Sequence, residues 1–224
     1  MEKITKVDEK FYGRLKSRSL TERQENLFDS LFQDVSISSF SDIDTSGYDK
    51  IFLEIGFGGG EHIAQMAINN PNSLFIGCEP FINGVASLLV KMDEDNIKNI
   101  KIYQEDARKL ISEIPDNLLA GVFLLFPDPW PKRRHIKRRF VQDKTIKSIY
   151  RILKNDGTWK IATDHLEYQK WVLKMFSQDW VKKIFSESLF NNSSRPSEEA
   201  WPKTRYEQKS VNDIIFAIYS KIAS

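Results

Sequence analysis

Short apolar segments alternate with longer amphipathic ones between residues 50 and 177, and this alternation constrains the fold more than any other feature. The segments that read as strands are 51–55, 73–78, 100–103, 121–126 and 159–163. Helical patterns lie at 62–67, 81–92, 107–114, 146–153 and 165–177, and two last strands are expected at 181–188 and 211–220. Such repeated alternation buries a parallel sheet between two layers of helices. We therefore predict an α/β fold with a seven-stranded, mostly parallel, doubly wound sheet.

The chain before this alternation is different. Residues 1–20 are polar and basic, and they predict a flexible arm. Thr21 and Gln24 fit a capping box, which satisfies the unpaired amides at the start of a helix. We expect a basic arm and a short helix over 1–40, followed by one domain over 41–224, an ordinary length for a single domain.

The charges are unevenly distributed. The chain has 33 Lys and Arg against 31 Asp and Glu, but the segment 132–139 holds six of the basic residues and no acid. The rest of the chain is therefore mildly acidic. Concentrated basic patches usually meet phosphates, so the small net charge of +2 hides a candidate nucleic-acid surface.

Other features exclude several classes of protein. The lone Cys78 excludes an internal disulfide framework, and no His/Cys cluster has metal-ligand spacing. The longest uncharged apolar run, 118–126, is far shorter than the roughly 20 residues of a membrane span. The charged N-terminus has no apolar signal region. We expect a cytoplasmic protein with neither a metal site nor a membrane contact.

Acidic residues stand at the ends of three consecutive predicted strands. Ligands of open α/β sheets bind outside the carboxyl ends of the strands. Glu54, beside the glycine-rich turn 56–60, suits a cationic group and would repel a pyrophosphate. Glu79 can accept hydrogen bonds from ribose hydroxyls, and Asp106 can accept one from an adenine amino group. The glycines alone would also suit a packing turn, but the three acids together predict S-adenosylmethionine as cofactor.

The most distinctive segment, 126–139, follows the fourth strand. Pro127 and Pro129 stiffen Asp128 in an extended loop, which fixes a carboxylate where the transferred group should lie. Trp130 offers an aromatic face for packing or base stacking. Residues 132–139, called the basic run below, come next. They contain no interleaved acids, whereas a solvated helix face usually does. Phosphate contacts would then lie beside the chemistry.

These segments resemble the bacterial tRNA (guanine-N7)-methyltransferase family over roughly residues 10–220. The matching motifs are 54–61, 77–79, 106–107, 127–139, 162–165 and 204–207. The Pro-Asp-Pro-Trp-Pro block is highly specific, whereas the glycine loop is shared by many methyltransferases. The resemblance implies a Rossmann-like, S-adenosylmethionine-dependent enzyme that methylates a guanine at position 46 in the tRNA variable loop, giving 7-methylguanosine.

The resemblance also implies roles for individual residues, with Asp128 as the catalytic acid. The implied cofactor residues are Glu54, Gly56, Gly58, Glu79, Asp106, Ala107 and Asp128. The implied substrate residues are Lys132, Asp164, Thr204, Arg205, Tyr206 and Glu207. The implied RNA contacts are Arg134, His135, Lys137, Arg138 and Arg139.

The chemistry of guanine N7 agrees with this set. N7 is an unprotonated ring nitrogen whose lone pair is exposed in the major groove, so it can attack a methyl sulfonium without losing a proton. Holding N7 in line with the methyl–sulfur bond then supplies most of the catalysis. Asp128 would hydrogen-bond the N1 or amino edge of guanine, or orient the cofactor.

We expect structural rather than catalytic roles for the remaining histidines and tryptophans, and a competing structural role for Thr204 and Glu207. His62 and His165 stand at predicted helix starts and read as surface or capping residues. Thr204 and Glu207 also fit a capping box, whose structural role competes with substrate binding. The tryptophans Trp159, Trp171 and Trp180 are expected in the core.

Two other functions stay open. An amino-methyltransferase acting on RNA or DNA adenine would carry an Asp/Asn-Pro-Pro-aromatic loop, and the order Pro-Asp-Pro-Trp at 127–130 disfavours it. A non-catalytic RNA-binding module could keep the fold, and the intact strand-end acids disfavour that. The oligomeric state, monomer or homodimer, and the tRNA species also stay open.

Overall fold

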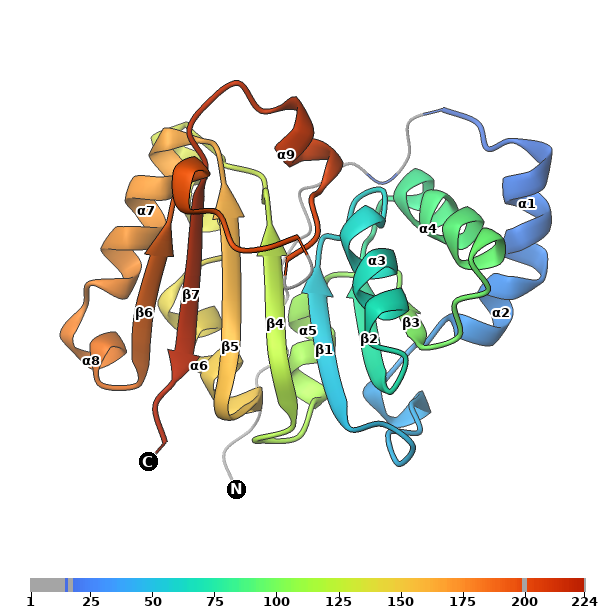
Figure 1. Cartoon of the computed structure of the whole chain (residues 1–224), viewed down its shortest axis with the longest axis horizontal. Helices are drawn as coiled ribbons and strands as arrows, with labels where there is room; N and C mark the ends of the chain where they lie inside the picture. The colour runs from blue at the N-terminus through green and yellow to red at the C-terminus, as the bar shows by residue number, and fades with distance from the viewer. Residues whose placement is uncertain (1–14, 16–17, 199–200, 224) are drawn as a thin grey trace.

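The computed structural model describes residues 15, 18–198 and 201–223, and their strands form a seven-stranded sheet in the order β3-β2-β1-β4-β5-β7-β6 (Figure 1). The strands β1 to β5 pair in parallel, and β7 runs antiparallel to both of its neighbours. The strand bounds are β1 Lys50–Ile55, β2 Ser73–Cys78, β3 Ile100–Tyr103, β4 Leu119–Leu125, β5 Leu153–Thr163, β6 Phe185–Phe190 and β7 Ile215–Lys221. The predicted seven-stranded, mostly parallel sheet is confirmed.

Helices cover both faces of the sheet (Figure 1). The helices α5, α6 and α7 bury their apolar side chains in one core cluster with β1, β4 and β5, whereas α1 to α4 pack into a second cluster on the other face. The helix bounds are α1 Glu22–Asp29, α2 Leu31–Val35, α3 Glu61–Asn69, α4 Ile82–Glu94, α5 Ala107–Glu113, α6 Asp143–Ile152, α7 Leu166–Phe176, α8 Asp179–Lys182 and α9 Arg205–Lys209. The doubly wound arrangement follows from these two layers.

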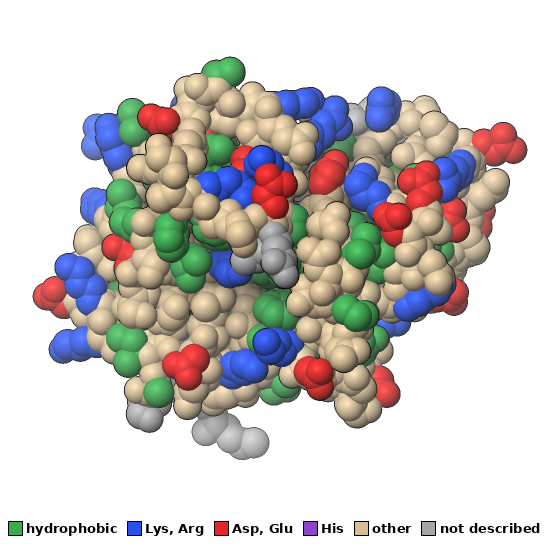
Figure 2. Space-filling view, in the orientation of Figure 1, with side chains coloured by type: hydrophobic (Ala, Val, Ile, Leu, Met, Phe, Trp, Pro, Cys, Tyr) green, Lys and Arg blue, Asp and Glu red, His purple; other side chains and the backbone are tan. Residues whose placement is uncertain are grey.

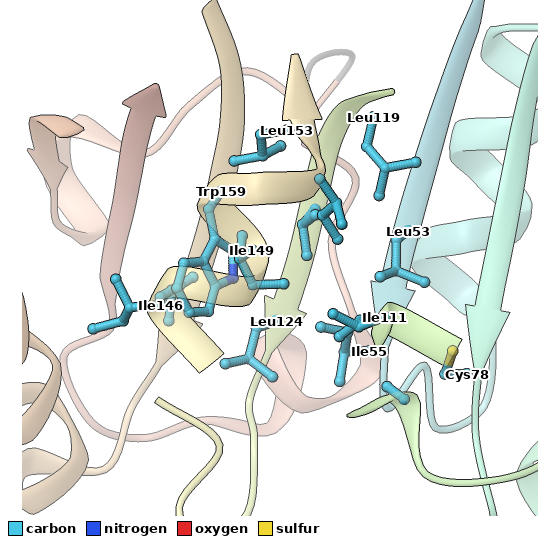
Figure 3. Packing of buried hydrophobic residues seen from close by; sticks show 14 of the residues in the cluster. Leu53, Ile55, Cys78, Ile111, Leu119, Leu124, Ile146, Ile149, Leu153 and Trp159 are labelled. Atoms are coloured by element: carbon cyan, nitrogen blue, oxygen red, sulfur yellow. The ribbon is translucent and has the colours of Figure 1, made fainter. Parts of the chain in front are cut away.

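The strand residues alternate between the two core clusters. In β1, Leu53 and Ile55 point to the cluster drawn in Figure 3, which also holds Ile111 of α5 and Leu124 of β4. Phe52 packs in the opposite cluster, because successive side chains of a strand point to opposite faces. Burying one such aliphatic side chain completely contributes about 1.5–3 kcal/mol to the free energy of folding.

The capping box at the start of α1 is confirmed. The Thr21 hydroxyl accepts from the Gln24 N–H (3.3 Å), and the Gln24 side chain accepts from the Thr21 N–H (3.0 Å). The predicted arm over 1–20 lies mostly outside the described residues. Two described residues of the arm contact the start of α4. Leu15 O accepts from the Ile82 N–H, and Arg18 O accepts from the Asn83 side chain.

Several predicted boundaries were wrong, and the largest difference is the start of β5, which was predicted at 159 and lies at Leu153. The helix predicted over 146–153 ends at Ile152, because the chain turns directly into β5 and Leu153 already pairs with Leu119. The strand predicted over 181–188 begins only at Phe185, since a helical turn buries Val181. The last strand begins at Ile215 rather than 211. Short apolar runs fit helix and strand periods equally well, so such boundaries are poorly specified locally.

The topology brings the carboxyl ends of β1 to β5 to one edge of the sheet. The strand order reverses between β1 and β4, which is where open α/β sheets bind their ligands. The segment that contains α9 crosses above this edge (Figure 1). The fold therefore gathers the loops after these strands under a C-terminal cover.

Candidate functional site

A pocket of about 550 Å³ lies at this edge, a size typical of cofactor sites. The predicted site residues that line it are Gly56, Gly58, Glu79, Asp106, Ala107, Asp128, Arg138 and Tyr206. Other predicted residues are not part of its wall, namely Glu54, Lys132, Arg134, His135, Lys137, Arg139, Asp164, Thr204, Arg205 and Glu207. The structure thus brings together acids from the ends of β2, β3 and β4.

The glycine turn after β1 uses conformations that favour glycine. Gly56, Gly58 and Gly60 have φ values of 70°, 57° and 78°. A Cβ on Gly60 would lie 2.8 Å from Cβ of Leu88, and one on Gly84 of α4 would clash with the carbonyl oxygen of Gly58. Because these glycines have no side chain, the turn and α4 can approach each other closely beside the pocket.

Glu79 ties this turn to α4. One carboxylate oxygen accepts from the Gly58 N–H (2.8 Å) and the other from the Phe81 N–H (2.9 Å). Burial raises the pKa of Glu79, while these two donors oppose the rise. A carboxylate offers about four acceptor sites, so Glu79 keeps acceptor capacity for a ligand in the pocket.

Asp106 caps α5 and is held by an arginine two residues on. Its Oδ1 accepts from the backbone N–H of Arg108 (3.0 Å), and the Arg108 guanidinium forms a fork with both carboxylate oxygens. Sequence reasoning missed Arg108. The sequence signal for this pair was the position of Arg108 two residues after Asp106, in the first turn of a predicted helix.

Glu54 lies inside the protein. Its Oε2 is 2.6 Å from Nδ1 of His62, and the two side chains are 4% and 1% exposed. The expectation that His62 is a surface residue was wrong, because α3 packs this ring edge-on against Phe123 of β4. Glu54 points to the same face as Phe52, where α3 lies, and not into the pocket.

The loop of Asp128 is strained at both ends. Phe126 and Trp130 have φ values of 50° and 41°, which are uncommon for residues with side chains and mark a conformation held by its surroundings. The Phe126 N–H donates to Ala162 O (2.8 Å), and the Arg139 guanidinium donates to the carbonyl oxygens of Pro129 (2.9 Å) and Trp130 (3.3 Å). Asp128 is exposed between these anchors and faces the pocket.

The basic run forms a 3-10 turn, Arg133–Arg138, beside the pocket. Its exposed cations are Lys132, Arg133, Arg134 and Lys137. Figure 2 shows further Lys and Arg side chains at the upper edge of the molecule, over the segment that contains α9 in Figure 1. The guanidinium of Arg138 lies 4.9 Å from the centre of the Trp130 ring and lines the pocket, and the His135 ring packs edge-on against Trp130.

Arg139 differs from its neighbours because it is 5% exposed and points inward. Its guanidinium lies 5.3 Å from the Trp171 ring and 5.8 Å from the Tyr168 ring, and burial lowers its pKa. The side chain that was expected to contact RNA instead holds the Asp128 loop. Trp159 is fully buried as expected, and Trp171 and Trp180 pack partly buried against the same core.

The C-terminal segment covers the pocket with Tyr206. The residue is 63% exposed, and its ring lies 6.3 Å from the Phe126 ring at an interplanar angle of 20° and would be 3.6 Å from a Cβ on Gly58. Arg205, next to it, is exposed. Tyr206 therefore stands between the glycine turn and the Asp128 loop.

Internal contacts fix this cover. The Thr204 hydroxyl accepts from the Glu207 N–H (3.0 Å), so half of the expected capping box forms. The Glu207 carboxylate instead pairs with Arg195, whose guanidinium also donates to Trp201 O (2.8 Å). Asp164, at the end of β5, accepts from the Ser210 hydroxyl (2.9 Å). His165 caps α7 through its backbone, without a side-chain cap bond.

No group of three or more His, Cys, Asp or Glu within 15, 18–198 and 201–223 could hold a metal ion. In the same part of the chain, no helix has the length and apolar character needed to cross a membrane.

Residues 48–214 match the family model described as "Putative methyltransferase". A curated tRNA (guanine-N(7)-)-methyltransferase from Caulobacter vibrioides (strain NA1000 / CB15N) is 39% identical over 205 residues, 90% of this chain and 89% of that protein. The chain belongs to the tRNA (guanine-N7)-methyltransferase family. A second relative with the same name, from Zymomonas mobilis subsp. mobilis (strain ATCC 31821 / ZM4 / CP4), is 39% identical over 208 residues, 89% of this chain and 87% of its own. The resemblance seen in the sequence is confirmed.

Solved structures support the fold of this methyltransferase. An rRNA methylase from Streptococcus thermophilus matches with a TM-score of 0.55 and 12% identity, covering 92% of this chain and all of that one (100%). An antibiotic-related methyltransferase matches with a TM-score of 0.56 and 14% identity, covering 93% of this chain and 98% of its own. The Rossmann-like methyltransferase fold is therefore confirmed.

Proposed function

We propose that this protein transfers a methyl group from S-adenosylmethionine to N7 of a guanine in tRNA, at position 46 of the variable loop, in the cytoplasm. The observation that carries the proposal is the arrangement of the pocket. Loops after β2, β3 and β4 place carboxylates in its wall, and the basic run, which holds the exposed cations, contributes Arg138 to the same wall. The relatives at 39% identity are named for this reaction on tRNA guanine.

The pocket residues fit the cofactor. Nothing lies within 4 Å of the position of a Cβ on Gly56, so a ligand can approach the backbone there. Glu79 has acceptor sites left for ribose hydroxyls, and Asp106 offers a carboxylate to an adenine amino group. Glu79 and Asp128 supply negative charge for a cationic ligand. When bound, S-adenosylmethionine supplies an electrophilic methyl group.

The protein's contribution is to hold the base rather than to remove a proton. Asp128 is exposed in the pocket and can accept from the N1–H and amino group of guanine, which leaves N7 free to point at the methyl group. The rings of Phe126, Trp130 and Tyr206 offer flat faces for the base. Alignment of N7 with the methyl group then lowers the barrier without a dedicated base.

The tRNA backbone would lie along the exposed part of the basic run. Lys132, Arg133, Arg134 and Lys137 can pair with phosphates and release counterions. Arg139 is buried, so we do not place it among the RNA contacts. Arg138 stacks on Trp130 at the pocket wall, where it can meet the nucleotide that enters.

Incubation of the protein with bulk tRNA and methyl-labelled S-adenosylmethionine, followed by mass analysis of the nucleosides, tests the proposal. The expected product is 7-methylguanosine. Label in N6-methyladenosine would favour an amino-methyltransferase instead. Binding of tRNA with no methyl transfer, together with calorimetry that detects no cofactor binding, would favour a non-catalytic RNA-binding module.

A further inference from the structure

The fork between Arg108 and Asp106 has a consequence for cofactor selection. We propose that Arg108 is a positioning residue that holds Asp106 for the 6-amino group of the cofactor's adenine, and so sets a preference for adenine over hypoxanthine. This inference rests on the proposed function. Both side chains line the pocket, and they are 26% and 10% exposed, respectively.

The sheet places Asp106 at the far end of the pocket from Asp128. Asp106 follows β3 and Asp128 follows β4, and the order β3-β2-β1-β4 separates these strands by three spacings. At roughly 4.8 Å per spacing, the two strand ends are about 14 Å apart. A methyl group delivered at Asp128 therefore leaves the opposite, nucleobase end of the cofactor beside Asp106.

Arg108 uses most of the acceptor sites of Asp106. Oδ1 accepts from the Arg108 backbone N–H (3.0 Å) and from Nε (2.9 Å), and Oδ2 accepts from Nη2 and, at 3.2 Å, from Nε. Nε carries one hydrogen, which the two oxygens share, so Arg108 supplies three donor hydrogens to about four lone-pair sites and leaves one site for a further donor. The planar guanidinium holds both oxygens in one orientation, which a lysine ammonium does not.

This arrangement distinguishes the two purines by their hydrogen-bonding groups. The 6-amino group of adenine donates, so it completes the acceptor sites of Asp106. The 6-oxo group of hypoxanthine only accepts, and it would set an oxygen against the carboxylate. Sites built to pair with one polar group reject analogues that leave a buried partner unsatisfied.

Calorimetry with S-adenosylhomocysteine and S-inosylhomocysteine tests the inference on the full chain. Arg108→Met should weaken binding of the adenosyl ligand about tenfold and reduce the adenosyl-to-inosyl affinity ratio by a similar factor. Asp106→Asn should bring the ratio near one, since an amide can also donate. In methyl transfer, Arg108→Met should raise the KM for the cofactor about tenfold, because weaker adenine binding is overcome as the cofactor concentration rises.

The matched control is Lys109→Met. Lys109 is the next residue of α5, carries the same charge, and pairs with Glu105 (2.6 Å) instead of Asp106, with both side chains more than half exposed. Its variant should leave the affinity ratio unchanged. If Arg108→Met does not fold by circular dichroism, Arg108→Lys decides the question, because it keeps the charge but cannot form the fork, and its ratio should fall.

The outcomes separate the inference from the proposed function. Wild-type protein that binds the adenosyl ligand, with an unchanged ratio in the Arg108 variants, overturns the role of Arg108 alone. Wild-type protein that does not bind S-adenosylhomocysteine overturns the proposed function, and the inference with it.

Discussion

The Nδ1 atom of His62 lies 2.6 Å from the Oε2 atom of Glu54, and this buried contact joins the end of β1 to the first turn of α3. The Gly56–Gly60 turn is the connection between these two residues, so the contact closes the loop that forms part of the pocket floor. Glu54 therefore supports the turn that lines the pocket and does not itself line it.

Removing the imidazole should unfold this connection. His62→Ala leaves the Glu54 carboxyl group buried without its hydrogen-bond partner, and an unsatisfied buried group of this kind costs about 1–3 kcal/mol. Urea denaturation should show that loss in the free energy of unfolding. The control Gln65→Ala, an exposed position on the same helix, should change stability by less than about 0.5 kcal/mol. Equal stabilities for the two variants would refute a structural role for the pair.

The raised pKa of Glu79 predicts a specific pH dependence of stability. Burial raises its pKa above the ordinary value of 4.5, so the native state holds this proton at a higher pH than the unfolded chain does. The contribution of the protonated Glu79 to the free energy of unfolding is therefore present below pH 4.5, and it is lost as the pH rises through the raised pKa.

Denaturation of wild type and Glu79→Gln across this window measures the effect. The free energy of unfolding of wild type should fall relative to that of the variant as the pH rises from 4.5. Glu25→Gln, at an exposed acid on α1, is the control and should show no comparable slope. A constant difference between wild type and Glu79→Gln would mean that Glu79 does not titrate in this window.

The exposed cations of the basic run should set the salt dependence of tRNA binding. Replacing Lys132, Arg134 and Lys137 with Ala removes three phosphate contacts, and the slope of log affinity against log salt should fall by about two to three. Filter binding between low and moderate salt measures this slope. The control replaces Lys174, Lys182 and Lys183, which lie on or beside α7 and α8, far from the pocket edge (Figure 1).

Arg139→Leu separates the buried guanidinium from its exposed neighbours. This variant should leave the salt slope near the wild-type value while slowing methyl transfer, because the Asp128 loop loses its two carbonyl anchors. A slope that falls as much as in the triple variant would place Arg139 on the RNA after all.

Asp128 itself is tested by a change that keeps its shape. Asp128→Asn removes the charge and one acceptor oxygen from an exposed position, so stability should hold while the turnover number falls about a hundredfold, as when other electrostatic groups in active sites are removed. Single-turnover kinetics with tRNA measure the step. Full activity in the Asn variant would show that the carboxylate is dispensable.

Local sequence patterns predicted much of the fold. The bounds of β2 and β3 match the predicted segments, because each is a short apolar run followed by a loop acid. The acids Glu79, Asp106 and Asp128 meet in one pocket because parallel strands end at one edge. The burial of Glu54 could have been found from strand parity, since it shares a face with Phe52.

Other features depend on contacts between distant segments. The inward turn of Arg139 depends on Trp171 and Tyr168, which follow about thirty residues later in α7. The cover over the pocket depends on the pairing of Arg195 with Glu207, which a one-dimensional pattern cannot foresee. A run of cations in a sequence therefore reveals a surface but not which member faces inward.

The position of the methyl group on tRNA tests the central claim most directly. Two transcripts of one tRNA, with guanine or adenine at position 46, are incubated with the enzyme and S-adenosylmethionine, then treated with borohydride and aniline, which cleave RNA at 7-methylguanosine. Cleavage at position 46 of the guanine transcript alone is the predicted result. Cleavage at another guanine, or methylation of both transcripts without cleavage at position 46, would contradict the account.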